Sequence, residues 1–298
     1  MCHIIVLICF VSMLVIYLCL KQLLCYTVSD CSAMLASTDS HGDKFTRMHT
    51  LIKKYNQIVR HNMHAKLNDP VFDTFVDKLK FKLFCSSIGV KTFKTLHIYD
   101  DVDEIDFSTS ASNYILKSNK ASGRNIIVKD GYIVTNTSCN NKQANQCIPY
   151  LRSQMKKWSD KYWNHKNEPQ YEYTSPKIFE EEFIEDIPDD IKISVYEGEM
   201  LFGWIDKNRF GKRVRNFFDF NFNRIACRGQ YSTTDDDHLI DRINKDKRLV
   251  KMLRDTAEKI AKAVPLDLVR VDLYLYNDEV YGGEVTLSPN AGNTIIRC

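Results

Sequence analysis

The chain has 298 residues, of which 44% are hydrophobic, with 41 lysines and arginines against 38 aspartates and glutamates. A chain of this length and composition can bury a large core, as one two-lobed domain or two small ones, which excludes an intrinsically disordered protein. The net charge of +3 is too small for a general nucleic-acid footprint, so any anion-binding site must be local.

The first segment of the chain is apolar and uncharged from Ile4 to Leu20, and Lys21 follows it. Its length is near the lower limit for a membrane-spanning helix, and the basic residues lie after it rather than before it. We therefore expect an uncleaved transmembrane signal-anchor over residues 1–26, with the body on the cytoplasmic side. A cleaved secretory signal peptide is the alternative, although its usual basic N-terminal region is missing.

Amphipathic patterns and capping residues predict the helices. After a polar spacer, they place helices over residues 44–66, 69–89, 147–163 and 245–264, the second beginning at Asp69-Pro70. We divide the chain into the anchor, a spacer with an amphipathic helix (27–68) and a catalytic domain (69–298), whose small lobe covers about residues 110–190.

β-branched runs bounded by turn residues predict short strands. They cover residues 95–99, 113–116, 125–129, 131–135, 193–196 and 200–205, with Asp130-Gly131 and Glu197-Gly198 as turns. Strands and helices mix without a regular βαβ repeat, so we predict an α+β fold with antiparallel sheets.

The most informative segment is a predicted hairpin near the end of the chain. Residues 270–274 and 281–289 flank the turn residues Asn277-Asp278. In paired strands Asp272 and Glu284 can project onto one face, where they repel each other unless a cation lies between them. Mg²⁺ held by one or two carboxylates and by substrate phosphates suits this pair. The alternative is a surface hairpin whose acids pair with Arg270 or with lysines.

Lysines near small polar residues are candidates for phosphate binding. Lys117 ends a predicted strand, and a loop with Ser122 and Gly123 follows it. A lysine beside free backbone N–H groups suits a phosphate chain, although a β-turn with a solvated lysine has the same pattern. Lys78 and Lys82 lie at i and i+4 on one helical face, which is usually only solvated.

The cysteines form no C-x-x-C pair, so neither a zinc site nor a disulfide framework is indicated. We expect free thiols. A bridge between Cys139 and Cys147 is the alternative if the body is extracellular.

In their order and spacing, a set of short motifs resembles the ATP-grasp superfamily. Those similar to D-alanine:D-alanine ligases are Asp77-Lys78-Leu79-x-x-Lys82, Leu116-Lys117 with Ser122-Gly123, the segment 181–184, Arg270-x-Asp272 and Glu284-x-Thr286-x-Ser288-Pro289. Those similar to the teichuronopeptide (TupA-like) branch, found with cell-surface polysaccharide genes, are Asp190-Ile-Lys192, Tyr196-Glu-Gly198, Asn216-Phe-Phe218-Asp219 and Gly283-Glu284-Val-Thr286. The resemblance covers roughly residues 70–294.

The resemblance implies ATP and Mg²⁺ as cofactors. The nucleotide would be held between two lobes of antiparallel sheet, in a domain that the N-terminal hydrophobic helix precedes in the sequence. It also implies a role for each matching residue. Lys78, Lys117 and Lys192 would bind the phosphates, and Ser122 and Gly123 would close over them. Glu181 and the Phe183 backbone would bind adenine, and Asp190 would bind the ribose. Asp272 and Glu284 would bind Mg²⁺, and Arg270 would stabilise the charge of the transferred phosphoryl group.

The function implied is that of an ATP-dependent carboxylate–amine ligase, which phosphorylates a carboxylate and lets an amine attack the acyl phosphate. A uronic acid of a surface glycan and an amino acid are the expected substrates. A phosphotransferase acting on a sugar or hydroxyl, and a catalytically silent glycan-binding or assembly protein, are the alternatives. The basic and aromatic segment 207–228 suits single-stranded nucleic acid or an acidic substrate. Given the resemblance we expect the acid, with Arg209 as its best candidate ligand, and no nucleic-acid partner.

Overall fold

The computed structural model describes residues 43–65, 67, 69–105, 107, 113–120, 123–135, 137–158, 168–185, 188–208, 212–234 and 237–298. The expected anchor over residues 1–26 lies outside them. The chain divides into two compact units, residues 1–47 and 48–298, and the second carries both sheets. None of the helices in the described ranges has both the length and the apolar character that crossing a membrane requires.

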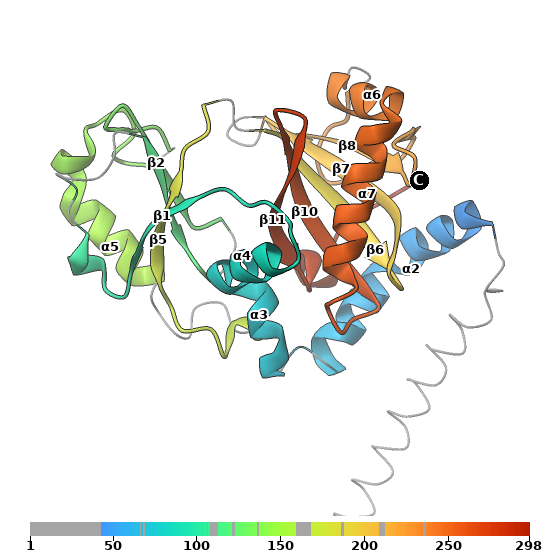
Figure 1. The fold of residues 1–298 in the computed structure, drawn as a ribbon, viewed down its shortest axis with the longest axis horizontal. Helices are drawn as coiled ribbons and strands as arrows, with labels where there is room; N and C mark the ends of the chain where they lie inside the picture. The colour runs from blue at the N-terminus through green and yellow to red at the C-terminus, as the bar shows by residue number, and fades with distance from the viewer. Residues whose placement is uncertain are drawn as a thin grey trace, which may run out of the picture. The chain divides into compact units, whose positions relative to one another are not determined.

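Two antiparallel sheets organise the second unit (Figure 1). The smaller sheet has the order β1-β5-β2-β3-β4 and the larger sheet the order β11-β10-β6-β7-β8-β9, which confirms the predicted α+β fold with antiparallel sheets. The strands of the smaller sheet are β1 (Thr95–Tyr99), β2 (Tyr114–Ser118), β3 (Asn125–Lys129), β4 (Tyr132–Ile133) and β5 (Ile178–Glu182). Those of the larger sheet are β6 (Asp190–Tyr196), β7 (Glu199–Lys207), β8 (Val214–Asp219), β9 (Arg224–Ile225), β10 (Leu268–Tyr276) and β11 (Glu279–Thr286).

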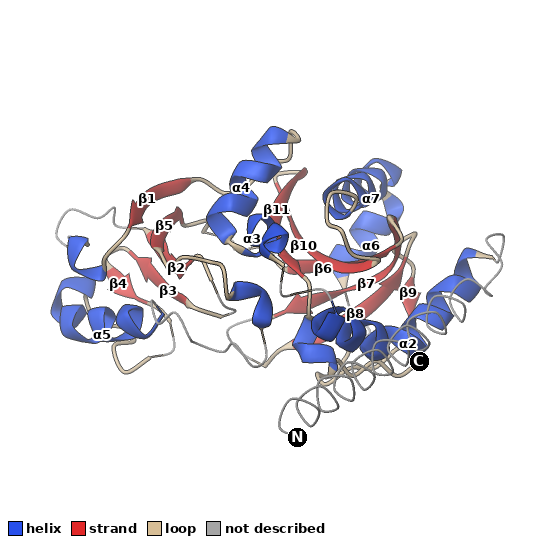
Figure 2. Ribbon diagram, turned by 90° about the horizontal axis from the view of Figure 1, so that it is seen from below, coloured by secondary structure: helices blue, strands red, loops and turns tan. Residues whose placement is uncertain are grey.

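Helices cover both faces of the larger sheet and flank the smaller one. They are α2 (Lys44–Ala65), α3 (Asp73–Val76), α4 (Lys78–Ser87), α5 (Ile148–Trp158), α6 (His238–Lys245) and α7 (Lys247–Ala261). Short 3-10 turns are η1 (Pro70–Phe72), η2 (Val102–Glu104), η3 (Ala144–Cys147), η4 (Pro169–Tyr171) and η5 (Pro289–Gly292). Figure 2 shows α6 and α7 on one face of the larger sheet and α2 on the other.

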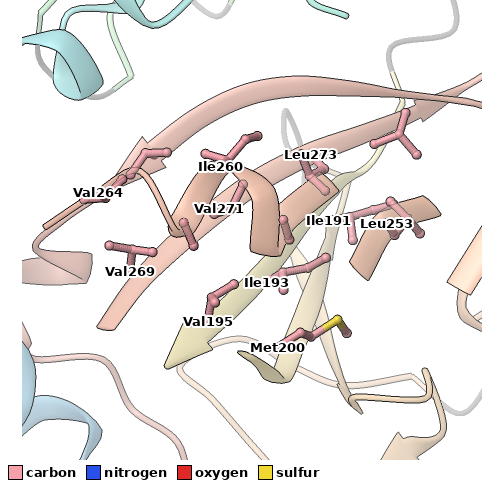
Figure 3. Packing of buried hydrophobic residues seen from close by; sticks show 14 of the residues in the cluster. Ile191, Ile193, Val195, Met200, Leu253, Ile260, Val264, Val269, Val271 and Leu273 are labelled. Atoms are coloured by element: carbon pink, nitrogen blue, oxygen red, sulfur yellow. The ribbon is translucent and has the colours of Figure 1, made fainter. Parts of the chain in front are cut away.

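The main core lies between the larger sheet and α7. On β10 the residues Val269, Val271 and Leu273 alternate with polar neighbours and are buried against Leu253 and Ile260 of α7 (Figure 3). Because successive side chains of a strand point to opposite faces, this apolar face leaves the alternate positions of the same strand free for chemistry.

Aromatic side chains cover part of the opposite face of the larger sheet. Tyr55 of α2 packs edge-on against Phe202 and Trp204 of β7, with ring centroids 5.7 and 6.5 Å apart. Phe217 of β8 extends this contact at 5.8 Å from Trp204. α2 therefore packs on the aromatic part of this face of the larger sheet.

The predicted helix over residues 69–89 is broken at Asp77. The Asp77 side chain accepts hydrogen bonds from the backbone N–H groups of Leu79 and Lys80 at 2.8 and 3.2 Å, so it caps the start of α4. Its extended backbone ends α3 one residue earlier. The helix predicted over 245–264 is present as α7, and the Asp246 side chain caps its start. A separate helix, α6, which was not predicted, precedes it.

The expectation of free thiols was wrong for four cysteines. Cys139 is bonded to Cys147, eight residues away, and Cys227 is bonded to Cys298, 71 residues away. The second pair meets because Arg228 and Arg297 exchange backbone hydrogen bonds of 2.8 and 2.9 Å, a long-range pairing that cysteine spacing does not reveal. Among the described cysteines Cys85 is free, and burial raises the pKa of its thiol to about 12.

We expect Leu253→Ala to lower the free energy of unfolding by about 2–5 kcal/mol, because it opens a cavity where α7 packs on the sheet. Lys259→Ala, at an exposed position of the same helix, is the matched control and should change stability by less than about 0.5 kcal/mol. Urea unfolding followed by circular dichroism measures both variants, and equal stabilities would contradict the packing described.

Candidate functional site

The predicted pair of acids stands at a bulge in the closing hairpin. Asp272 of β10 lies directly opposite Glu284 of β11, and the register shifts at the next residue, so Gly283 is the extra residue of the bulge. A Cβ on Gly283 would lie 2.9 Å from the Asp272 carbonyl and 2.7 Å from the Tyr274 ring, so the close approach of the two strands requires glycine. The bulge thereby fixes where the Glu284 side chain leaves its strand.

Cations surround Asp272. Arg270 donates to both of its carboxylate oxygens, at 2.6 and 2.8 Å, and also to the Thr286 hydroxyl at 2.8 Å. Lys192 of β6 forms a further ion pair with Asp272. Burial raises the pKa of the Asp272 carboxyl, but the charges of Arg270 and Lys192 outweigh burial and hold it at about 2. The acid is therefore ionised at neutral pH.

The alternative interpretation of the hairpin, in which its acids pair with Arg270 or with lysines at the surface, is partly correct. Asp272 does pair with Arg270 and with a lysine. The pairing is not on a surface, however, because Asp272 is 2% exposed and lines a cavity. Glu284 is the more accessible acid, and its Oε1 lies 3.8 Å from Arg270.

A second buried acid, Glu181 of β5, neutralises two of the lysines. It pairs with Lys117 of β2 and with Lys82 of α4, the latter at 2.5 Å. Burial raises the pKa of Glu181, but the two lysine charges outweigh it, so that the pKa is lower than usual. Burial also lowers the pKa of Lys82 and of Lys78, with nearby acids opposing the shift.

Asn119 connects the two segments that carry these lysines. Its side-chain amide donates to the Asp77 carboxylate at 2.8 Å, and its backbone carbonyl accepts a hydrogen bond from the Lys78 backbone N–H at 2.9 Å. The start of α4 is thereby tied to the end of β2, so that Lys78 and Lys117 reach one cavity.

Most of the predicted site residues line one cavity, which we call the nucleotide cavity after the ligand that the sequence predicts for it. Lys78, Lys82, Lys117, Gly123, Glu181, Asp190, Lys192, Asp272 and Glu284 line it. Phe183 lies just after β5 and does not line it, while Ser122 and Arg209 lie outside the described residues. The individual roles expected for these residues stay predictions.

The nucleotide cavity is small in this conformation. Its volume is about 70 Å³, whereas pockets that hold cofactors or drug-sized ligands usually measure about 300–1,000 Å³. The residues of the Glu181 and Asp272 ion pairs are part of its wall. A nucleotide would need more space than this conformation provides.

A second cavity, the Arg213 cavity, has a volume of about 820 Å³ beside the first. Its walls include Arg213, Arg215, Trp204, Tyr231, Arg270 and Glu284, together with Val134, Thr135 and Asn140 from the smaller lobe. Arg215 is held by Asp206 at 2.6 and 2.8 Å and lies 4.9 Å from the ring centres of Trp204 and Tyr231.

Arg213 differs from the other cations of the site. It donates to the Tyr231 hydroxyl at 3.1 Å and lies over the same ring at 5.0 Å. It has no carboxylate partner among the described residues, whereas Arg215, Arg270 and Lys192 each have one. Its charge is therefore available to an anion in the cavity.

A third cavity, the Gln170 cavity, has a volume of about 430 Å³. Its walls include Val76, Arg124, Glu168, Gln170, Tyr171, Arg270, Glu284, Thr286, Ser288 and Asn290. Glu284 borders all three cavities, and Arg270 borders the second and third.

The residues present fit a magnesium ion. Asp272 and Glu284 provide the hard oxygen donors that Mg²⁺ prefers, from opposite positions of adjacent strands. Within the described ranges there is no group of three or more His, Cys, Asp and Glu that could hold a metal. Phosphate oxygens and water would therefore have to supply the remaining ligands, which is the usual manner of Mg²⁺ binding beside a nucleotide.

Sequence reasoning did not give two residues their contacts in the site. Lys82 was noted as one end of an i, i+4 pair and as the last residue of a family motif, but nothing in the sequence pairs it with Glu181. Arg213 belongs to the basic segment from which Arg209 was chosen, and the tyrosine that contacts it lies 18 residues further on.

Comparison with known proteins gives one family. The family model described as TupA-like ATPgrasp matches residues 58–296. A search of curated proteins gave no match.

Solved structures resemble the chain only distantly. A D-alanine–D-alanine ligase from Bacillus anthracis complexed with ATP is 16% identical, over 72% of this chain and 54% of its own, with a TM-score of 0.39. The corresponding ligase from Coxiella burnetii is 12% identical, over 74% and 50%, with a TM-score of 0.43. The ATP-grasp ligase PsnB complexed with Mg and ADP is 12% identical, over 72% and 50%, at 0.38.

The chain spans about half the length of these structures. The family match covers most of the chain and agrees with the two antiparallel sheets and with the motifs gathered at the nucleotide cavity. This protein therefore belongs to the TupA-like ATP-grasp family.

Proposed function

We propose that the protein is an ATP- and Mg²⁺-dependent ligase that joins a carboxylate to an amine through an acyl phosphate. One observation carries the proposal: Glu284 borders the nucleotide cavity and two further cavities, and Arg270 lies between the latter two. A ligase of this kind needs three substrates to meet at one point, whereas a phosphotransferase needs two.

The lysines would bind the phosphate chain by exchanging partners. In the structure Glu181 neutralises Lys82 and Lys117, and Asp272 neutralises Lys192. Phosphate oxygens can replace these carboxylates as charge-assisted acceptors, so nucleotide binding would release Glu181 and Asp272 for other contacts. Bound Mg²⁺ would add charge neutralisation at the phosphates, with Asp272 and Glu284 as its protein ligands.

The acid would enter through the Arg213 cavity. No carboxylate of the described residues forms an ion pair with Arg213, and the rings of Trp204 and Tyr231 provide flat apolar surface there. An acidic sugar combines a carboxylate with a ring that packs on aromatic faces, which supports a uronic acid as the substrate. The role predicted for Arg209 stays a prediction, because Arg209 lies outside the described residues.

The reaction would take place beside Arg270. A carboxylate oxygen of the acid attacks the γ-phosphorus of ATP, and ADP leaves. The amine nitrogen then attacks the acyl carbon, inorganic phosphate leaves with the electrons of the broken C–O bond, and the amine loses a proton. Arg270, which also donates to the Thr286 hydroxyl, would stabilise the negative charge on the phosphoryl oxygens in both steps.

The proposal has two further parts. A role in surface polysaccharide synthesis or modification rests on the branch that the motifs resemble. The signal-anchor and a cytoplasmic body stay predictions, because residues 1–26 lie outside the described part of the chain. The need for ATP supports a cytoplasmic body, whereas the two disulfides are typical of oxidising compartments and support the opposite side of the membrane.

The first prediction concerns the intermediate. With ATP, Mg²⁺, glucuronic acid and hydroxylamine, the protein should form a hydroxamate and ADP in equal amounts, because hydroxylamine captures an acyl phosphate. Colorimetric hydroxamate and coupled ADP assays measure both products. ADP release with a phosphorylated sugar and no hydroxamate would favour the phosphotransferase, and no reaction with any uronic acid would favour a silent binding protein.

Glu284→Gln is the decisive variant in this assay, because it removes one of the two charges proposed to hold Mg²⁺. It should abolish hydroxamate formation. Glu279→Gln is its matched control, since Glu279 lies on the same strand but pairs with Lys91 at the surface, and it should remain active.

Asp272 and Glu284 should differ in their effect on stability. Asp272→Asn removes the buried carboxylate on which Arg270 and Lys192 converge, and we expect it to lower the free energy of unfolding by about 3 kcal/mol. Glu284→Gln removes a more exposed group 3.8 Å from Arg270 and should cost less than about 1 kcal/mol. Urea unfolding compares the two variants. Equal losses would contradict the ion-pair network, whatever the activity.

Arg213 should determine the affinity for the acid. Arg213→Gln should raise KM for the uronic acid by roughly tenfold or more and leave KM for ATP unchanged, since a hydrogen bond between charged groups is lost in one cavity only. Lys212→Gln, at the exposed neighbouring position, is the control. Steady-state kinetics with the hydroxamate readout measures both. A normal KM for the acid in Arg213→Gln would remove this residue from the site.

A further inference from the structure

Two segments without acidic side chains meet at the end of the chain. Helix α2 contains five lysines and arginines and no aspartate or glutamate, and the closing segment, residues 289–298, has no acid either. Asn56 of α2 joins them: its side-chain amide donates to the Thr294 carbonyl at 2.7 Å, and its side-chain oxygen accepts from the Thr294 backbone N–H at 3.0 Å. The two segments are thus held together by paired hydrogen bonds.

A fourth cavity, the Arg297 cavity, lies where these segments meet. Its volume is about 470 Å³, within the range of ligand pockets. Lys53 and His49 of α2 and Arg297 of the closing segment contribute basic side chains to its walls, and Ile52 and Ile296 contribute apolar surface. No aspartate or glutamate of the described residues lines it. The three cavities around Glu284 contain charges of both signs, whereas the charged side chains here are all basic.

Arg228 and Arg297 lie directly opposite each other. Their backbones exchange hydrogen bonds of 2.8 and 2.9 Å as an antiparallel bridge, so both side chains leave on the same face. Like charges in this position repel and lower stability. The neighbouring disulfide between Cys227 and Cys298 ties the two backbones together.

Neither arginine of this pair has an acid to neutralise it. Both side chains are exposed, and among the described residues no carboxylate forms an ion pair with Arg228 or Arg297. The chain therefore holds two like charges side by side at a cost and supplies no counter-charge of its own. An anion from outside the chain would remove this repulsion.

The surroundings of the arginine pair suit a phosphate that is attached to hydrocarbon. Guanidinium groups bind phosphate oxygens through parallel N–H groups, and a lysine adds a point charge. Ile52 and Ile296 line the same cavity, and the adjacent Ile295 is 40% exposed. Phosphate joined to apolar carbon is the chemistry of a phospholipid headgroup.

The position along the chain also favours a lipid. Residues 21–43 separate the apolar stretch Ile4–Leu20, the predicted membrane segment, from the start of α2. Fully extended, they span at most about 80 Å. Basic segments that follow a membrane segment attract anionic lipids.

We propose that Arg228, Arg297 and Lys53 bind the phosphate of an anionic phospholipid, with the glycerol and acyl carbons against Ile52 and Ile296. The Arg297 cavity is then a second attachment of the protein to a membrane, in addition to the predicted anchor. It takes no part in phosphoryl transfer, and it does not depend on the proposed ligase function.

The test uses the full-length chain in a non-ionic detergent and a soluble short-chain lipid. Dihexanoyl phosphatidylglycerol is titrated below its critical micelle concentration. Dihexanoyl phosphatidylcholine, glycerol 3-phosphate and inorganic phosphate are titrated for comparison, and calorimetry measures each Kd. Phosphatidylglycerol should bind to one site, roughly tenfold or more tightly than the other three, and more weakly at high salt.

Arg228→Gln combined with Arg297→Gln should weaken this binding by roughly tenfold or more, because charge-assisted hydrogen bonds to phosphate are lost. Lys259→Gln combined with Lys262→Gln is the control. It removes two exposed charges at the end of α7, on the opposite face of the larger sheet, and should bind as the unaltered protein does.

Urea unfolding of the arginine variant gives a second readout. Its midpoint should equal or exceed that of the unaltered protein, because the repulsion between the two side chains is relieved. A clearly lower midpoint would mean that the arginines support the fold, and it would contradict their role as a ligand site.

Other outcomes overturn the proposal. Normal affinity for phosphatidylglycerol in the arginine variant removes the pair from the site. Equal signals from phosphatidylglycerol and phosphatidylcholine in all variants mean partition into detergent only. Equal affinity for phosphatidylglycerol and inorganic phosphate means a site for free phosphate. If phosphatidylglycerol does not bind, and oligogalacturonate binds in a manner that depends on the arginines, the cations take an acidic glycan instead of a lipid.

Discussion

Strand β10 carries the constraint on which the rest of the structure depends. Its odd-numbered residues Val269, Val271 and Leu273 are buried in the core against α7, and this fixes the strand so that Arg270 and Asp272 face the cavities. A shift by one residue would place the charges in the core, so packing and chemistry specify the same register. The bulge at Gly283 then sets Glu284 opposite Asp272.

The site neutralises itself in this conformation. Two buried acids, Glu181 and Asp272, occupy the lysines and the arginine that a phosphate chain would need. This arrangement removes the cost of buried unpaired charge, and it also keeps the nucleotide cavity at about 70 Å³. The two larger cavities need no such rearrangement. In the proposed function, nucleotide entry would be the step that opens the site, and the same exchange of partners would free Asp272 to bind a metal ion.

The sequence predicts the elements of this site better than their contacts. The closing hairpin, the Asp272–Glu284 pair and the lysine at the end of β2 follow from local alternation, turn residues and motif order, because each depends on a few neighbouring positions. The pairing of Lys117 and Lys82 with Glu181 depends on strands 64 residues apart and on a helix break at Asp77. Local patterns do not contain that information.

Contacts between segments far apart in the sequence also explain the other differences between the sequence predictions and the structure. The bond between Cys227 and Cys298 joins segments 71 residues apart through one backbone pairing. Arg213 and Arg209 have the same residue type and the same kind of neighbours in the sequence. The hydrogen bond from Arg213 to Tyr231 depends on a residue 18 positions away, which the local pattern does not indicate. Such features become visible only when the cavities have been formed by segments from the whole second unit.

The most direct test of the central claim is calorimetric titration of the full-length chain with a non-hydrolysable ATP analogue, with and without Mg²⁺. If phosphates and a metal ion replace the internal ion pairs, binding should be strong with Mg²⁺ and weak without it. Equal affinity in both conditions would contradict the role of Asp272 and Glu284 as metal ligands. No binding in either condition would contradict a nucleotide site between the two sheets.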